Sequence, residues 1–203
     1  MRADCAVLFD IGGVLEHTPD LGVRATWEAR LGLDPGALDP VLQPVWAAGS
    51  VGRISEAAVH AELGARLGLD PDGVQAFMAD VWREYLGTPN LTLLAYVRSL
   101  RARVRTGIVS NSFVGARERE EGHLGLSGLG EVVVYSHEVG LWKPDPAIYT
   151  YALDQLGLPA SRVAFVDDLP ENVEAAEQLG MTGVLHWDDD ETIAAVERFL
   201  AVV

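Results

Sequence analysis

The feature that most constrains the fold is a short apolar run, residues 6–9, that ends in an aspartate and a glycine turn. The run contains no polar residue (Ala6-Val7-Leu8-Phe9), which is typical of a strand buried on both faces of a parallel sheet. Asp10 follows at once, and Gly12 and Gly13 come directly after it. Ligands of open α/β sheets bind beyond the carboxyl ends of the strands. Asp10 therefore lies where chemistry is expected.

Beyond residue 91 the chain alternates apolar runs with amphipathic stretches. The expected strands are Arg105–Ser110, Val132–Ser136, Val163–Asp167 and Gly183–His186. The expected helices include Pro146–Leu156, Pro170–Leu179 and the closing stretch Asp190–Val202. Alternation of this kind predicts a doubly wound α/β fold with a parallel sheet that is covered by helices on both faces.

Residues 16 to 90 show helical periodicity instead. Apolar residues recur at three- and four-residue spacing in four stretches, Leu21–Leu31, Pro40–Ala47, Ser55–Leu67 and Asp72–Leu86. We therefore expect residues 1–15 and 91–203 to form the α/β core, and residues 16–90 to form an inserted all-helical cap.

One heptapeptide occurs twice in this segment, as residues 29–35 and again as residues 65–71. Its glycine is expected to end one helix, and its Asp-Pro pair is expected to begin the next.

Composition argues against two classes of partner. The formal net charge of −15 repels polyphosphate backbones, so we expect no nucleic-acid partner, and an anionic substrate must be held by local positive charge. No apolar run approaches the length of a membrane span, and the N-terminus lacks a basic region followed by a long apolar segment. We expect a cytoplasmic monomer or homodimer with no membrane partner, in which the single cysteine, Cys5, is a small buried apolar residue.

Polar residues also follow the later apolar runs. Ser110 and Asn111 close one run. Lys143 lies in an expected loop, in the segment Trp142-Lys143-Pro144-Asp145-Pro146. Asp167 and Asp168 end a third run. Two adjacent carboxylates at a strand end repel each other unless a cation is present, so this pair indicates a metal site.

In order and spacing, these segments resemble the haloacid dehalogenase (HAD) superfamily, and the resemblance spans the whole chain. It implies that Asp10 is a nucleophile that forms an aspartyl-phosphate, with Ser110 and Lys143 as further catalytic residues. Magnesium would be held by Asp10, Asp168 and the carbonyl of Gly12, since Mg²⁺ prefers hard oxygen ligands.

The same resemblance assigns the remaining polar residues. Ser110 and Asn111 would donate hydrogen bonds to the phosphoryl group, and Lys143 would supply a compact positive charge. Asp167 and Asn172 would be supporting residues of the site, with Asn172 supporting the acidic pair of Asp167 and Asp168. The function implied is a magnesium-dependent phosphatase acting on a small-molecule phosphate ester through a helical cap of type 1.

Gly12 departs from the pattern of most phosphatases of this superfamily. Those enzymes carry a second aspartate at this position, which protonates the leaving group. General acid–base help of that kind is worth about 10²–10⁴-fold in rate. A subset that includes bacterial sugar-phosphate phosphatases related to glucose-1-phosphatase has a similar glycine-containing pattern, which favours a sugar phosphate or a similar metabolite as substrate. Glu16 or His17 could supply the missing proton.

Two other functions stay open at this point. A 2-haloacid dehalogenase uses the same aspartate, lacks the second one and needs no magnesium, but it resembles this chain less at Asp167 and Asp168, where it carries uncharged residues. A catalytically weak relative that binds a phosphometabolite or a partner protein is favoured by Gly12. The intact Asp10 and Lys143 argue against it.

Overall fold

A five-stranded parallel sheet forms the centre of the protein. The computed structural model describes residues 4–203, and the strands are β1 (Ala6–Phe9), β4 (Arg105–Ser110), β5 (Val132–Tyr135), β6 (Val163–Asp167) and β7 (Thr182–Leu185). The strand order is β5-β4-β1-β6-β7, and every pair is parallel. The predicted α/β fold class is confirmed. Because β1 is central, the residue that follows it is flanked by the ends of β4 and β6.

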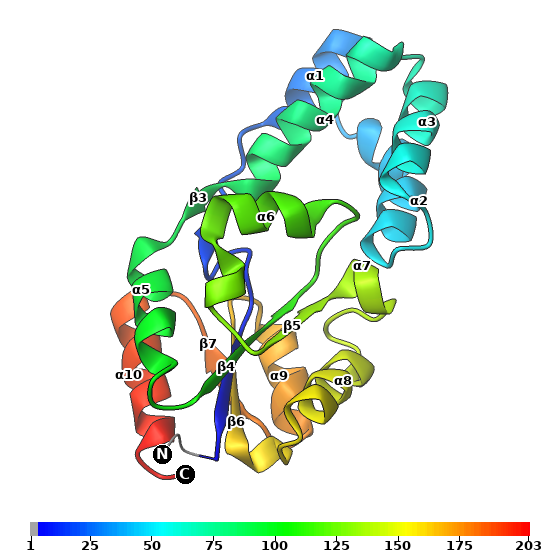
Figure 1. Cartoon of the computed structure of the whole chain (residues 1–203). Coiled ribbons are helices and arrows are strands. Elements are labelled where there is room, and N and C mark those ends of the chain that lie inside the picture. The colour runs from blue at the N-terminus through cyan, green and yellow to red at the C-terminus, as the bar shows by residue number, and fades with distance from the viewer. Residues whose placement is uncertain (1–3) are drawn as a thin grey trace.

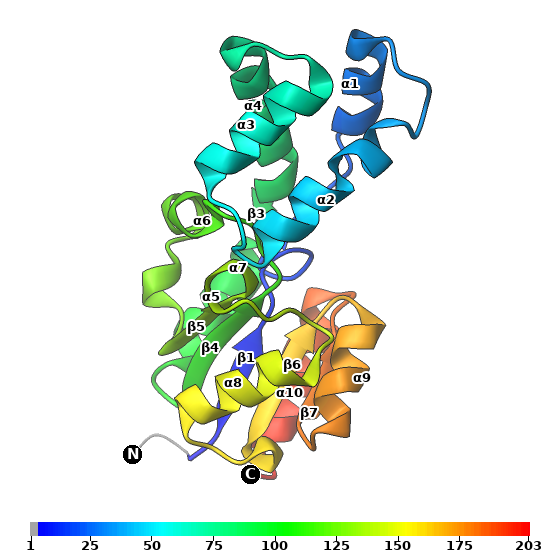
Figure 2. The same cartoon turned by 90° about the vertical axis from the view of Figure 1, so that its right-hand side faces the viewer.

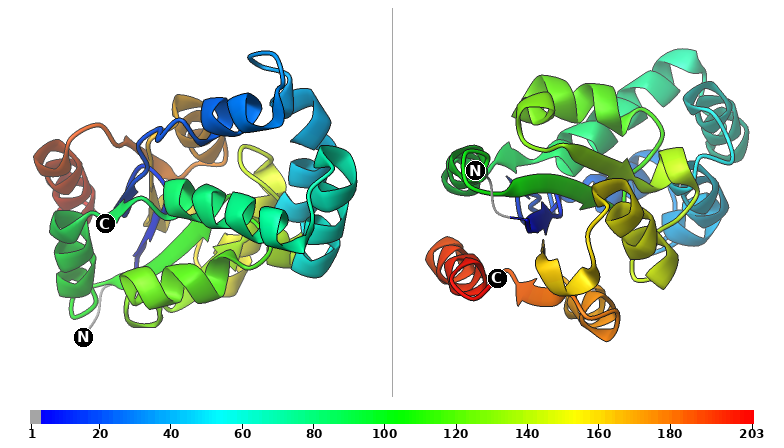
Figure 3. Two further views of the ribbon diagram at one scale, coloured as in Figure 1. Left: turned by 90° about the horizontal axis from the view of Figure 1, so that it is seen from above. Right: turned by 60° about the horizontal axis from the view of Figure 1, so that its bottom comes forward.

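Two helix layers cover the sheet (Figures 1 and 3). α5 (Leu91–Leu100) and α10 (Asp189–Leu200) pack on one face, and α8 (Pro146–Leu156) and α9 (Pro170–Gln178) pack on the other. Alternate residues of β1 pack against the two helix layers. Val7 and Phe9 join the first hydrophobic cluster, whereas Ala6 and Leu8 join the second. This explains why the run has no polar position.

Four helices fill the segment between β1 and α5. They are α1 (Val23–Leu31), α2 (Leu38–Ser50), α3 (Glu56–Leu67) and α4 (Pro71–Leu86), and we call them the insertion helices. They extend away from the sheet on the side of its carboxyl ends (Figure 2). Their hydrophobic cluster centres on Trp27, Leu42, Leu63 and Phe77 and also takes in Phe113 from the chain after β4. Because the insertion helices have their own hydrophobic cluster, we interpret them as a helical cap on the α/β domain.

The chain enters and leaves the insertion helices through a short pair of strands. β2 (Glu16–His17) and β3 (Thr88–Pro89) pair antiparallel. Sequence reasoning did not anticipate this pair, since two residues are too few to show a period. The pairing places Glu16 beside the point where the chain returns to the core.

The repeated heptapeptide behaves as expected in only one of its copies. Gly32 and Gly68 end α1 and α3 in the left-handed region, with φ of 66° and 67°. In the second copy Asp70 caps α4, accepting a hydrogen bond from the Gly73 N–H at 2.8 Å. In the first copy the prediction that the Asp-Pro pair begins a helix is wrong, because Gly36 follows the pair with φ of 83°. The chain turns again there, and α2 begins only at Leu38.

Other predicted element boundaries differ from those of the structure by a few residues. The strand expected to run to Ser136 stops at Tyr135, because Ser136 begins the short helix α7 (Ser136–Val139). The remaining elements are α6 (Ala116–Leu124) and the 3₁₀ turns η1 (Leu126–Gly128) and η2 (Ala160–Arg162). Cys5 is buried, as predicted. Within residues 4–203, no helix is both long enough and apolar enough to cross a membrane.

Candidate active site

The ends of three neighbouring strands bring the predicted site residues together. Ser110 is the last residue of β4 and Asp167 is the last residue of β6. Asp10 follows β1, which lies between them, and its N–H donates to the Val166 carbonyl at 2.9 Å. All three side chains are buried. Parallel pairing therefore gathers residues that are far apart in the sequence at one edge of the sheet.

Lys143 joins this group from the loop between α7 and α8. Its Nζ lies 2.7 Å from Asp10 Oδ1 and 2.7 Å from Asp167 Oδ2, and its side chain is fully buried. The loop is held by Asn111, whose Oδ1 accepts from the Lys143 N–H at 2.7 Å and whose Nδ2 donates to the Lys143 carbonyl at 2.8 Å. The Asn111 side chain thus positions Lys143. Its expected contact with a phosphoryl group stays a prediction.

Asp167 is fully engaged by the protein. Its Oδ2 faces Lys143, and its Oδ1 accepts from the Leu169 N–H and from Asn172 Nδ2, both at 2.9 Å. Asn172 is itself buried, and its carbonyl accepts from the Tyr149 hydroxyl at 2.9 Å. This arrangement is what a supporting role for Asp167 and Asn172 requires. Asp168, by contrast, is half-buried.

The three aspartates form a compact group of oxygen donors. One carboxylate oxygen from each of Asp10, Asp167 and Asp168 lies within 4.8 Å of the others. Both oxygens of Asp167 are bonded within the protein, whereas the ion pair of Asp10 with Lys143 is made by Oδ1, so Asp10 and Asp168 are the carboxylates left to face a cation. Two carboxylates with room for water and a backbone carbonyl match the donor set that Mg²⁺ prefers.

Gly13 allows Asp168 to approach the turn after β1. Its φ is 72°, and a Cβ at this position would lie 2.3 Å from Asp168 Oδ2. A side chain would therefore displace the carboxylate, besides requiring a conformation that L-residues rarely adopt. Sequence reasoning did not assign this role to Gly13. The adjacent glycines 12 and 13 were the available signal, but they did not show which of the two is sterically required.

Burial and charge set the protonation of the carboxylates. Burial raises the pKa of Asp10 to about 7; the charge of Lys143 opposes this rise and that of Asp167 adds to it. Burial, followed by the charge of Asp167, also raises the pKa of Asp168. The ionised forms of both groups are thus disfavoured in the protein alone. A cation placed against them favours those ionised forms.

A cavity of about 500 Å³, the central crevice, opens beside these groups between the core and the insertion helices. Its lining includes Gly12, Glu16, Val81, Tyr85, Ser110 and Asn111. Glu16 is buried, and its Oε2 has no hydrogen-bond partner among the described residues. Burial, with the charges of Glu120 and Asp10, raises the pKa of Glu16 to about 9. Glu16 thus carries a proton at neutral pH, whereas His17, the other replacement acid considered, is exposed.

Comparison with known proteins agrees with this geometry. The sequence model of the haloacid dehalogenase-like hydrolases matches residues 6–180. The chain is 34% identical over 86 residues to the pyrimidine 5′-nucleotidase YjjG of Escherichia coli, which is 42% of this chain and 38% of that protein. It is 33% identical over 73 residues to the rat bifunctional epoxide hydrolase 2, which is 36% of this chain and 13% of that protein. The chain therefore matches well under two thirds of the length of these relatives.

Solved structures match over nearly the whole chain. A HAD-like family hydrolase from Porphyromonas gingivalis is 25% identical with a TM-score of 0.75, and the alignment covers 97% of both chains. A HAD family enzyme from Bacteroides thetaiotaomicron, in complex with magnesium and inorganic phosphate, is 18% identical with a TM-score of 0.77, covering 90% and 94%.

A 2-haloacid dehalogenase from Pseudomonas syringae is 22% identical with a TM-score of 0.70, covering 99% of both chains. At 18% and 22% identity, the last two structures show that the fold is shared and nothing more. Together with the match over residues 6–180 and the arrangement at the strand ends, they lead to one conclusion: the chain belongs to the family of haloacid dehalogenase-like hydrolases.

Proposed function

We propose that this hydrolase is a magnesium-dependent phosphatase that cleaves a small phosphate monoester through an aspartyl-phosphate on Asp10. The observation that carries the proposal is the pairing of Asp10 with Lys143 beside a second available carboxylate, Asp168. A nucleophilic carboxylate, a buried cation and a metal-binding acid are the parts that phosphoryl transfer needs at one point.

Different residues of the chain would bind the phosphoryl group and the metal ion. Lys143 places a fixed positive charge against the attacking carboxylate, and Ser110 presents a hydroxyl at the end of the adjacent strand. Asp10, Asp168 and the Gly12 carbonyl would hold Mg²⁺. When bound, this ion neutralises charge on the phosphoryl oxygens. Asp167 holds Lys143 in place, and Asn172 holds Asp167.

The reaction takes two displacements at phosphorus. In the first, a carboxylate oxygen of Asp10 forms a bond to phosphorus, the ester P–O bond breaks, and the alcohol leaves after gaining a proton. In the second, water attacks the phosphorus of the aspartyl-phosphate and gives up a proton. Inorganic phosphate leaves, and the Asp10 carboxylate is regenerated. The ion pair with Asp167 would hold the Lys143 ammonium in the same place during both steps.

Similar proteins support the same chemistry. One structural neighbour was crystallised with magnesium and inorganic phosphate, and one sequence relative is a pyrimidine 5′-nucleotidase. A dehalogenase is the second candidate, since a 2-haloacid dehalogenase shares the fold. Asp168 favours the phosphatase, because an accessible carboxylate next to Asp10 has a clear use with a metal ion and none in metal-free dehalogenation.

The test is a phosphate-release screen over sugar phosphates, nucleotides and phosphorylated acids, run with magnesium and with chelator. We expect release only with magnesium. Asp10→Asn should abolish release, because the amide keeps nearly the same shape but cannot attack. The exposed Asp190 at the start of α10 offers the matched control, and Asp190→Asn should keep wild-type turnover.

Other outcomes would identify the alternatives. Undiminished activity in chelator, or turnover of 2-chloropropionate under those conditions, would reassign the protein to the dehalogenases. Tight binding of phosphate esters without any turnover would indicate a binding protein. Turnover that survives in Asp10→Asn would place the nucleophile elsewhere.

A further inference from the structure

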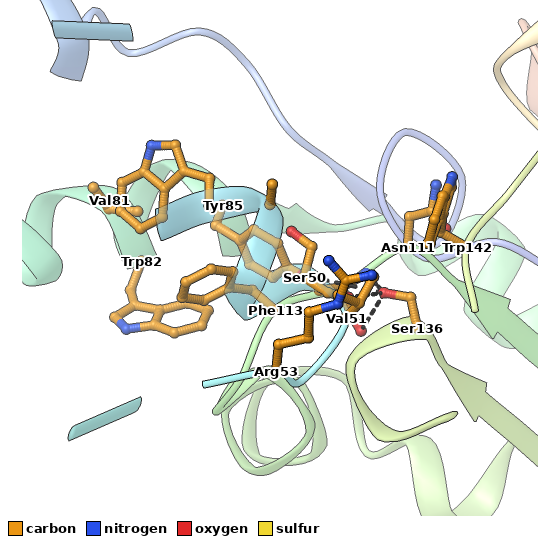
Figure 4. A pocket seen from close by; sticks show the side chains of 13 residues that line it. Ser50, Val51, Arg53, Val81, Trp82, Tyr85, Asn111, Phe113, Ser136 and Trp142 are labelled. Atoms are coloured by element: carbon orange, nitrogen blue, oxygen red, sulfur yellow. Dashed lines mark hydrogen bonds between the residues drawn. The ribbon is translucent and has the colours of Figure 1, made fainter. Parts of the chain in front are cut away.

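A second cavity extends away from the site, between the insertion helices and the loop after β4. Its volume is about 530 Å³, and it lies between α2, α4 and residues 111–113 (Figure 4). It shares Val81, Tyr85 and Asn111 with the central crevice. We call it the aromatic cavity. Because the two spaces share these walls, they adjoin, and the aromatic cavity offers room for the alcohol portion of a phosphate ester held at Asp10.

Aromatic rings that pack against one another form most of the wall. The Trp46 and Phe113 rings meet edge to face with centroids 5.3 Å apart, and the Phe113 and Trp82 rings lie 6.1 Å apart. Trp82 in turn meets Tyr85 edge to face at 5.3 Å. Such contacts hold each ring in place. The wall is therefore formed before any ligand arrives.

Several polar groups of the lining are occupied by the protein itself. Ser136 Oγ donates to the Ser50 carbonyl at 2.7 Å, and Ser112 Oγ bonds to His137 Nδ1 at 2.6 Å. Both halves of the Asn111 amide bond to the Lys143 backbone. The charged side chain among the lining residues, Arg53, is exposed and lies beside Ser50 and Ser136 at one end of the cavity (Figure 4). Trp82 Nε1 is buried without a partner among the described residues, but most of the wall is aromatic, so a ligand with many hydroxyl groups would find few partners here.

We propose that the substrate is a phosphate monoester whose alcohol portion is large and apolar, with the phosphate at Asp10 and the hydrocarbon in the aromatic cavity. This inference rests on the proposed phosphatase function. A sugar in this cavity would give up water and gain partners for only a few of its hydroxyls, which costs binding energy. An apolar group gains from leaving water and needs no partner. A cavity of this size and character is usual for small-molecule sites.

The test compares esters of primary alcohols, whose leaving groups are alike, so that differences report on the cavity. The probes are ethyl, hexyl and 2-phenylethyl phosphate, with glycerol 3-phosphate and glucose 6-phosphate as polar esters. We expect kcat/KM for the hexyl and phenylethyl esters to exceed that for ethyl phosphate by at least about tenfold, and the polar esters to do no better than ethyl phosphate. The order of hexyl and phenylethyl esters separates an aliphatic from an aromatic substrate, and either order supports the proposal.

Substitutions test the location of the effect. Ala47 lines the aromatic cavity and is exposed, so Ala47→Glu puts a charge there without disturbing the packed core. The hexyl-to-ethyl ratio of kcat/KM should fall by at least about tenfold in this variant. Ala57, exposed on α3, does not line the cavity, and Ala57→Glu should leave the ratio unchanged.

A binding measurement separates failure of this inference from failure of the proposed function. In the Asp10→Asn variant, quenching of tryptophan fluorescence should give a dissociation constant for hexyl phosphate at least about tenfold below that for ethyl phosphate. Equal constants, or equal kcat/KM for ethyl, hexyl and sugar esters in an active enzyme, would overturn the inference and leave the phosphatase intact. Absence of phosphate release from every ester would overturn the proposed function and, with it, this substrate class.

Discussion

Replacing Glu120 by glutamine tests whether a buried carboxyl beneath the insertion helices lowers the stability of the fold at neutral pH. Glu120 lies on α6 and is fully buried. The Tyr135 hydroxyl donates to its Oε2 at 2.5 Å. Burial raises the pKa of Glu120 to about 6, although hydrogen bonds from Tyr135 and Tyr85 and the charge of Arg117 oppose the rise. The ionised form is therefore disfavoured in the folded protein.

The size and sign of the effect follow from the pKa. A rise from 4.5 to about 6 corresponds to about 2 kcal/mol between the two protonation states. Because folding raises the pKa, the stability that the neutral form provides is complete below pH 4.5 and is lost as the pH rises through about 6. Glutamine has the shape of the neutral acid and no proton to lose. The free energy of unfolding of Glu120→Gln should therefore match the wild type near about pH 4 and exceed it by about 1–2 kcal/mol above about pH 7.

The assay is urea unfolding, followed by tryptophan fluorescence at a series of pH values for both proteins. Glu118 lies on the same helix and is exposed, so Glu118→Gln is the matched control and should change the unfolding free energy by less than about 0.5 kcal/mol at every pH. A difference between Glu120→Gln and wild type that does not vary with pH would refute the reasoning. A loss of stability in the variant at about pH 8 would do the same.

Three further substitutions probe the site itself. Lys143→Met leaves the buried Asp10 and Asp167 carboxylates without their ion pair; urea unfolding should show a loss of about 3–5 kcal/mol, and an unchanged unfolding free energy would mean that these carboxylates are neutral. Gly13→Ala places a Cβ 2.3 Å from Asp168 Oδ2 at a φ of 72°; calorimetric titration should show weakened magnesium binding, and wild-type affinity would remove Asp168 from the metal site. Gly12→Asp should fold normally, because Gly12 is not in the left-handed region and its Cβ would meet nothing within 4 Å. That variant should raise turnover of alkyl phosphates by up to about 10²-fold while changing p-nitrophenyl phosphate little, and an absence of gain would mean that Glu16 already supplies the proton.

The strand ends were predictable because burial on two faces leaves little choice of residue. Arg105–Ser110 and Val163–Asp167 were predicted to the residue, since the apolar stretch in each strand stops where polar groups reach the edge of the sheet. Polar residues directly after such runs then lie together at the same edge of the sheet. The family resemblance added their roles, but the gathering of Asp10, Ser110 and Asp167 follows from parallel pairing alone.

Contacts between distant elements could not be predicted in this way. The burial of Glu16 depends on the β2–β3 pair and on α6, whose residue Glu120 raises its pKa, and no local pattern links these segments. The Asn111 amide was expected at the phosphate, which stays a prediction, and its two hydrogen bonds to the Lys143 backbone were not foreseen. An exposed amide next to a strand end has both options. Which one it takes is decided by the loop that packs against it.

The charges at the strand ends do not balance, and this imbalance links stability to ligand binding. Three aspartates share one lysine, in a chain whose formal net charge is −15. A phosphate ester would add further negative charge, so tight binding requires a positive charge that the described side chains around the site do not supply. The proposed Mg²⁺ meets that need, and it would favour the ionised form of Asp10, which burial alone disfavours. A cation that binds only the folded state at about 100 times its dissociation constant adds about 2.7 kcal/mol to the free energy of unfolding. The aspartates that weaken the protein alone would therefore become a source of stability once the metal is bound.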